Sequence, residues 1–176
     1  LGDDTADREG RLTLNPLPHI DLFGTILLPL MTLSRGWGIF GYAKPVPYNP
    51  FNVRGRYGEL KIALAGPATN LLIAAAFAVA MRAGYAGMFP LSDVLIKLLM
   101  YGVLINIWLA LFNLVPIPPL DGSKILFLFI KEENYQLRLM LQRYGIVLLI
   151  FFIFFGVQII YPLAQFLIGI FLGSAG

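Results

Sequence analysis

The chain has 176 residues, of which 58% are hydrophobic and only 13% are charged. A soluble domain would carry about twice this share of charged residues, so the composition predicts a membrane protein. The net charge of +3 does not indicate a nucleic-acid partner, because the loops beside membrane spans account for it. The absence of cysteine excludes disulfides and thiolate metal sites.

The first third of the chain predicts no complete membrane span. Residues 1–19 are polar and are expected to form an ordered surface loop or a short strand, since residues 11–14 alternate briefly. Residues 20–33 are apolar but short and contain Pro29, which favours a re-entrant or interfacial hairpin. The chain from there to residue 59 is rich in glycine, proline and aromatic side chains, and predicts a loop at the depth of the lipid headgroups.

Three later stretches are apolar and long enough to cross a membrane: residues 60–81, 94–115 and 144–160. Each approaches the length of about 20 residues that spans about 30 Å of hydrocarbon. Residues 163–172 are too short to cross alone and are expected to form an interfacial or tilted tail. The sequence therefore predicts one all-α membrane domain, residues 1–176, a polytopic bundle with about three transmembrane helices and the hairpin.

Two of these spans carry polar side chains that lipid would not tolerate alone. Around Gly66 the first span is built of small residues, which would let another helix approach closely, and Asn70 could donate a hydrogen bond across that contact. Plain packing is the simpler interpretation of this stretch. On the second span, Asn106 and Asn113 lie two helical turns apart, so both amides are expected to face the bundle.

Asp121 is the only acidic residue between Asp93 and Glu132, and it ends an apolar stretch interrupted by three prolines. A carboxylate at membrane depth usually has a partner such as a metal ion, a cation or a proton path. The prolines must break the helix, which lipid tolerates only where protein or water covers the freed carbonyls. Alternatively, Asp121 only caps the next helix through its side-chain oxygen. The residues alone leave both interpretations open.

Residues 113–122 read Asn-Leu-Val-Pro-Ile-Pro-Pro-Leu-Asp-Gly. This stretch resembles the N-x-x-P-x-x-P-L-D-G motif of the site-2 protease family, which consists of intramembrane zinc metalloproteases. Three further stretches resemble the bacterial branch of that family and follow its order, namely residues 10–21, 43–50 and 65–70. The last 50 or so residues carry only hydrophobicity, so the resemblance there is unspecific.

One feature of the family is missing. Its H-E-x-x-H helix binds zinc through two histidines and supplies a glutamate as general base, but this chain has a single histidine, His19, with no glutamate before it. His19 lacks a partner at i+4, so we expect it to bond to Asp21 or to a backbone carbonyl. We expect the remaining zinc ligands upstream of Leu1, and we expect this chain alone to be inactive.

The resemblance implies one catalytic zinc ion, held by Asp121 and two histidines, with the fourth position left for water. It also implies a catalytic role for Asn113, whose amide could stabilise the developing oxyanion by about 3 to 4 kcal/mol. A hydrogen bond between helices is an equally good interpretation of Asn113.

Positive charge predicts the orientation of the chain. Only Arg82 and Lys97 flank the loop between the first two spans. Most other loop cations precede the first span or follow the second: Arg35, Lys44, Arg54, Arg56, Lys61, Lys124, Lys131, Arg138 and Arg143. By the positive-inside rule these regions are cytoplasmic, which places Asp121 near the cytoplasmic side of the cell membrane.

Two classes of function are consistent with the sequence. The first is an intramembrane zinc metalloendopeptidase that cleaves membrane-embedded or membrane-associated protein segments, seen here without its histidine-bearing helix. The second is a non-catalytic, multi-pass membrane scaffold or binding module of the same fold. In either case the expected partners are membrane lipid and a membrane protein, and no nucleic acid.

Overall fold

The computed structural model describes residues 3–13, 15, 17–20, 26, 30, 52 and 57–173. Contacts divide the chain into two compact units, residues 1–58 and 59–176, which are described in turn. The described residues contain helices and turns but no strand. The expected hairpin at residues 20–33 and the loop that follows it fall almost entirely outside the described residues, so they stay predictions.

The first unit contains two short helices, α1 (Thr5–Arg8) and the 3-10 helix η1 (Leu17–His19). Between them Arg11 is 5% exposed and donates a hydrogen bond to the carbonyl oxygen of Pro18. Residues 11–13 do not form the short strand that their alternation suggested, because no second chain segment pairs with them among the described residues. The side chain of His19 and all of Asp21 lie outside the described residues.

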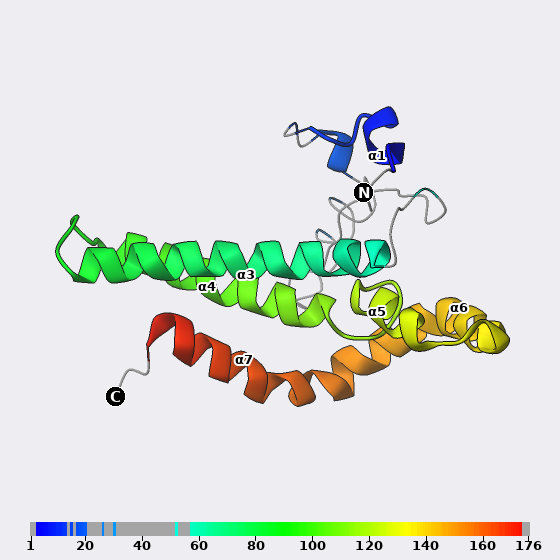
Figure 1. Ribbon diagram of the computed structural model, residues 1–176. Helices are drawn as coiled ribbons and strands as arrows, with labels where there is room; N and C mark the ends of the chain where they lie inside the picture. Colours follow the sequence, from blue (N-terminus) through cyan, green and yellow to red (C-terminus); the bar gives the residue numbers. More distant parts are fainter. Residues whose placement is uncertain are drawn as a thin grey trace. The chain divides into compact units, whose positions relative to one another are not determined.

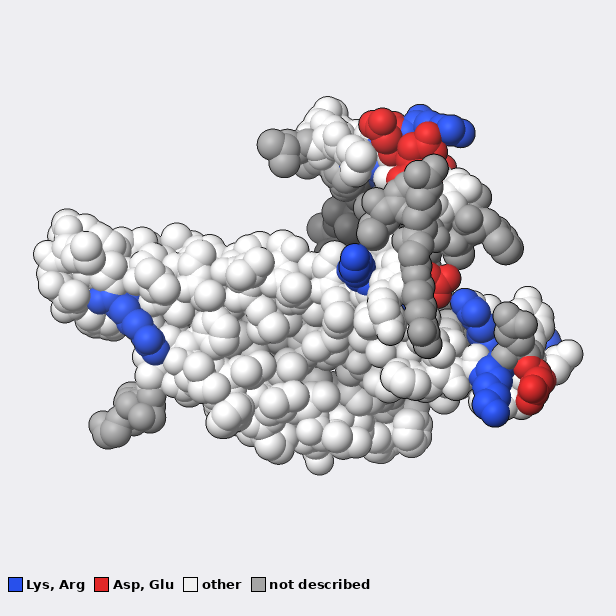
Figure 2. Space-filling model, viewed as in Figure 1, with Lys and Arg blue, Asp and Glu red and all other residues white. Residues whose placement is uncertain are grey.

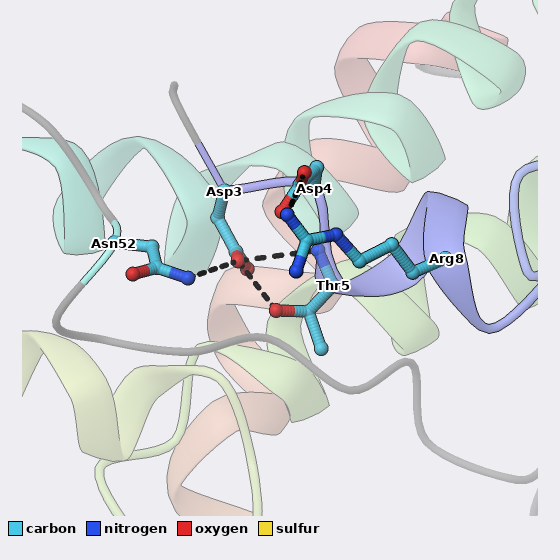
Figure 3. A network of polar contacts seen from close by, with 5 residues as sticks. All are labelled: Asp3, Asp4, Thr5, Arg8 and Asn52. Carbon is cyan, nitrogen blue, oxygen red and sulfur yellow. Dashed lines mark hydrogen bonds and ion pairs between the residues drawn. The ribbon is translucent and has the colours of Figure 1, made fainter.

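A small polar network surrounds the start of α1 (Figure 3). The Asp3 carboxylate accepts hydrogen bonds from the backbone and the hydroxyl of Thr5, and from the side-chain amide of Asn52 at 3.4 Å. Arg8 pairs with Asp4 at 2.7 Å, one helical turn earlier. Both members of that pair are more than half exposed, so it contributes little to stability. The network joins residues 49 positions apart within the first unit.

The second unit is built from three helical stretches that are long and apolar enough to cross a membrane (Figure 1). They are α3 (Gly58–Tyr85), α4 (Asp93–Asn113) and the continuous helical run Tyr135–Leu172. At 1.5 Å per residue they measure about 42, 32 and 57 Å. The expected all-α fold with three membrane-spanning helices is therefore confirmed. On the face that Figure 2 shows, the charged side chains of this unit lie toward its ends, and the flank between them is uncharged.

The third helical run is longer than the sequence predicted. It consists of α6 (Tyr135–Phe151), the π-helix η5 (Phe152–Gly156) and α7 (Val157–Leu172), and it bends along its length (Figure 1). The sequence placed the end of the span before Pro162, but Pro162 lies inside α7. A proline removes one backbone donor, which a helix survives where its neighbours hold it in place. Residues 163–172 continue that helix and are not a separate tail.

The core of this unit lies where α3, α4 and α7 meet. One face of α4 supplies three buried residues spaced four apart, Val103, Ile107 and Leu111, as expected for one helical stripe. The rest of the buried cluster consists of small residues: Ala74 and Ala78 from α3, and Ala164 from α7. Because small side chains allow helices to approach closely, Ala164 lets α7 pack tightly against this stripe of α4.

Two contacts fix the ends of the helices. Ser92 precedes α4 and its hydroxyl accepts the backbone N–H of Leu95 at 3.2 Å, which satisfies one free donor of the first turn. Near the last turn of α3, Arg82 donates to the carbonyl oxygen of Ile170 in α7 at 2.8 Å. This bond satisfies a carbonyl close to the end of α7, where no intrahelical donor follows.

Candidate metal centre

The chain leaves α4 through a series of tight turns that carry the proline-rich motif. After Asn113 the backbone N–H of Val115 donates to the carbonyl of Phe112, and that of Leu120 donates to the carbonyl of Ile117. The peptide bond between Pro118 and Pro119 is cis. The predicted break of the helix at these prolines is thus present, and it ends where α5 (Gly122–Phe129) begins.

Gly122 lets this segment fold back onto the end of α4. A Cβ atom at this position would lie 2.2 Å from the carbonyl oxygen of Leu114 and 2.5 Å from that of Val115. Both are backbone atoms, which cannot move aside without rebuilding the turn. Glycine at position 122 is therefore required by the path of the chain that brings Asp121 into place.

Asp121 immediately precedes α5 but does not cap it. Its side chain forms no hydrogen bond to the backbone of the first turn, and its own backbone is already helical. Instead, its Oδ1 atom pairs with the ammonium group of Lys124 at 2.6 Å, and the Asp121 side chain is 29% exposed. The alternative that Asp121 serves only as a helix cap therefore finds no support in the structure.

The other carboxylate oxygen of Asp121 faces α3. A Cβ atom built on Gly66 would lie 3.2 Å from Oδ2, and no other described atom would come within 4 Å of it. Gly66 itself is exposed, whereas the neighbouring Pro67 is fully buried. The small-residue stretch expected to let a helix approach thus brings α3 close to a carboxylate.

The two asparagines of α4 differ in their bonding. Asn106 donates to the carbonyl of Gly102, one turn earlier in its own helix, at 2.8 Å. Asn113, the last residue of α4, is half-buried, and its side-chain amide forms no hydrogen bond with any described residue. Both asparagines are half-buried, which agrees with the expected shared polar face. Neither forms a hydrogen bond between helices within the described part of the chain. The amide of Asn113 is free to bind another group.

Asp121 has the chemistry of a zinc ligand, because carboxylate oxygens bind this ion at about 2.0 to 2.2 Å. A complete zinc site needs at least three protein ligands. Among the residues that the structure describes, no group of three histidine, cysteine, aspartate or glutamate side chains lies close enough to hold an ion. Asp121 therefore fits as one ligand, and the described residues do not complete the site.

Sequence reasoning missed two features of this site. Lys124 was counted only as a loop charge, although its spacing of three residues from Asp121 on a helix would have predicted the pair. Gly66 was interpreted as a helix-packing residue. No pattern in the sequence indicates that it lies beside the side chain of Asp121, which follows α4.

The fold and the motif together indicate a class: a helical membrane protein with a break between helices, at which lies a motif that resembles the metal-binding motif of intramembrane metalloproteases. The family model of peptidase family M50 matches residues 83–156. The chain is 41% identical over 131 residues to the putative zinc metalloprotease YwhC of Bacillus subtilis, a match that covers 72% of this chain and 57% of that protein. These matches support a relationship to the site-2 protease family, which the motifs of the chain resemble.

Two other relatives carry similar names. The putative zinc metalloprotease MJ0611 of Methanocaldococcus jannaschii is 44% identical over 66 residues, covering 38% of this chain and 32% of its own length. The zinc metalloprotease RasP of Bacillus licheniformis is 40% identical over 70 residues, or 36% of this chain and 17% of its own. The chain thus spans little more than half of YwhC and less of the others. No solved structure matches it significantly.

Proposed function

We propose that the whole protein to which these residues belong is an intramembrane zinc metalloendopeptidase. The observation that carries the proposal is the state of Asp121: it follows a helix break, it does not cap α5, and its carboxylate is partly exposed. Zinc metalloproteases among the relatives support the metal and the reaction class. The remaining ligands would be histidines outside the described residues.

In this proposal the residues of the chain have distinct tasks. Asp121 would supply one anionic ligand for the ion from the turn before α5. A zinc ion, when bound, would lower the pKa of its water to about 7, which makes hydroxide available at neutral pH. The side-chain amide of Asn113 would donate a hydrogen bond to the oxyanion that develops when the scissile carbonyl is attacked. The α4 helix carries this amide and leads directly into the ligand turn.

The substrate would be a membrane-embedded or membrane-associated peptide segment. Helical backbone in a membrane hides its amide bonds in internal hydrogen bonds, so such a segment must unwind locally before a nucleophile reaches a carbonyl. The excess of positive charge in the loops supports an orientation with Asp121 near the cytoplasmic side of the cell membrane. Membrane lipid is then the second partner of the chain.

The test uses the whole protein, including any residues that flank this sequence, purified in detergent. We expect one zinc ion per chain by elemental analysis and cleavage of a transmembrane peptide. Asp121→Asn keeps the size of the side chain and should remove both zinc and cleavage. Asp93→Asn, at an exposed carboxylate in the first turn of α4, is the matched control and should leave both unchanged.

Two results would contradict the assignment. If Asp121→Asn keeps wild-type zinc occupancy and cleavage, Asp121 is no ligand. If the whole wild-type protein binds no zinc and cleaves nothing, the alternative function, a membrane scaffold of the same fold, is the correct one.

A further inference from the structure

The two oxygens of the Asp121 carboxylate have different surroundings. Oδ1 is held by the ammonium group of Lys124 at 2.6 Å. Oδ2 lies close to α3, because a Cβ atom built on Gly66 would be only 3.2 Å from it. Of the two oxygens, Oδ2 is therefore the one without an ammonium partner, and it can lie this close to α3 because residue 66 is glycine.

Other glycines of this unit serve packing, and the difference is visible in what surrounds them. A Cβ on Gly102 would lie 2.6 Å from the ring of Phe77, which marks a contact between α4 and α3. A Cβ on Gly145 would lie 2.5 Å from the backbone oxygen of Pro118. Gly66 is exposed, and among the described residues it approaches only the carboxylate. Gly66 therefore differs from Gly102 and Gly145 in that its close neighbour is a carboxylate and not an aromatic ring or a backbone carbonyl.

We propose that Gly66 is a positioning residue of the metal centre: by having no side chain, it lets α3 lie against Asp121 without displacing Oδ2 from the position in which it could bind a zinc ion. This inference rests on the function proposed above. Metal sites tolerate ligand displacements of only about 0.2 Å. A contact at 3.2 Å is tighter than ordinary van der Waals packing, so even a methyl group would push the carboxylate away by a few tenths of an ångström. A branched side chain would displace the carboxylate further, since the helix restricts its rotamers.

The experiment measures zinc affinity in the whole protein by competition with a chelator, for wild type, Gly66→Ala and Gly66→Val. We expect the affinity to fall with side-chain size, by about 10-fold or more for valine, the loss typical of disturbing a group that orients a ligand. Stability should behave differently. Alanine is a better helix former than glycine, so the melting temperature of Gly66→Ala should stay constant or rise while its zinc affinity falls.

Cobalt substitution gives a second readout that a structural role would not change. The absorption bands of bound Co²⁺ report the geometry of its ligands, and we expect Gly66→Val to shift or weaken them. Gly169→Ala serves as a neutral control, because a Cβ there meets nothing within 4 Å. Gly102→Ala is the control for packing damage: it should lower the melting temperature through Phe77 while zinc affinity stays at the wild-type value.

Three outcomes overturn the proposal. The first is wild-type zinc affinity in Gly66→Val. The second is an equal loss of affinity in Gly102→Ala, which would make the effect one of general stability. The third is a wild-type protein without zinc. If Asp121→Asn abolishes zinc binding but Gly66→Val does not, the inference about Gly66 fails while the proposed function stands. If Asp121→Asn retains zinc, the proposed function itself fails.

Discussion

Gly145 of α6 lies directly against the backbone of Pro118, so close that a Cβ at position 145 would be 2.5 Å from the Pro118 carbonyl oxygen. Gly145 is the only buried residue of α6. The long third helix, most of whose apolar surface is exposed, thus lies close against the segment that carries Asp121. This contact, together with the return of Gly122 onto the end of α4, determines where Asp121 lies.

This contact predicts the effect of Gly145→Ala. The new methyl group would meet backbone atoms, which cannot rotate away, so α6 or the motif turn must move. Overpacking of this kind lowers the free energy of unfolding by about 1 to 3 kcal/mol. Thermal unfolding in detergent measures the change. Gly169→Ala, on the same helical run but in open space, should be neutral or slightly stabilising. Equal melting temperatures for the two variants would contradict the close contact.

The proposed role of Asn113 can be tested separately from that of Asp121. Its amide has no hydrogen-bond partner among the described residues, so Asn113→Ala should leave the fold and the zinc content unchanged. If the amide stabilises the oxyanion, cleavage should slow by about 100-fold to 1,000-fold with little change in KM. Asn106→Ala is the matched control, because that amide bonds within its own helix. Wild-type cleavage rates in Asn113→Ala would exclude the proposed role.

The sequence predicted those parts of the fold that depend on one property, the length of an apolar stretch. The starts of α3 and α4 agree with it within a few residues, because polar and charged residues flank them. The end of the third helix was wrong for a physical reason. Proline was taken as a stop signal, but inside a helical run with a π-helix just before it, Pro162 is accommodated and the helix continues to Leu172.

The residues of the candidate site could likewise be predicted only in part from the sequence. Asp121 and Asn113 could be named from the sequence because their motif is local and contains a carboxylate where lipid would not tolerate one. Gly66 could not be assigned its neighbour, since that contact joins residues 55 positions apart and depends on how α3 is rotated against the turn. Periodicity indicates which residues share a helix face, but it does not indicate what lies opposite.

Lys124 offers a prediction about charge. Its ammonium group and a zinc ion would both lie close to the Asp121 carboxylate, and their like charges repel by about 1 to 2 kcal/mol even with the screening of water. Lys124→Met should therefore strengthen zinc binding in the whole protein by roughly tenfold, measured by competition with a chelator. The loss of the partly exposed ion pair should lower stability by about 1 kcal/mol or less. Lys131→Met, an exposed cation in the following loop, is the control. Weaker zinc binding in Lys124→Met would show instead that the ammonium orients the ligand.

The orientation of the helices is tested by labelling with a membrane-impermeant thiol reagent. The sequence contains no cysteine, so single substitutions give no background from these residues. Met88→Cys lies in the exposed turn between α3 and α4, and Glu133→Cys lies in the turn between α5 and α6. Between these two turns, α4 is the one described helix long enough to cross a membrane, so the turns should lie on opposite sides. Positive charge gathers around the second turn. We therefore expect Met88→Cys to react in intact cells and Glu133→Cys to react only after permeabilisation. Labelling of both variants in permeabilised cells confirms that each thiol is accessible. Reaction of both from the same side would contradict a membrane crossing by α4, and the reversed pattern would place Asp121 near the outer side.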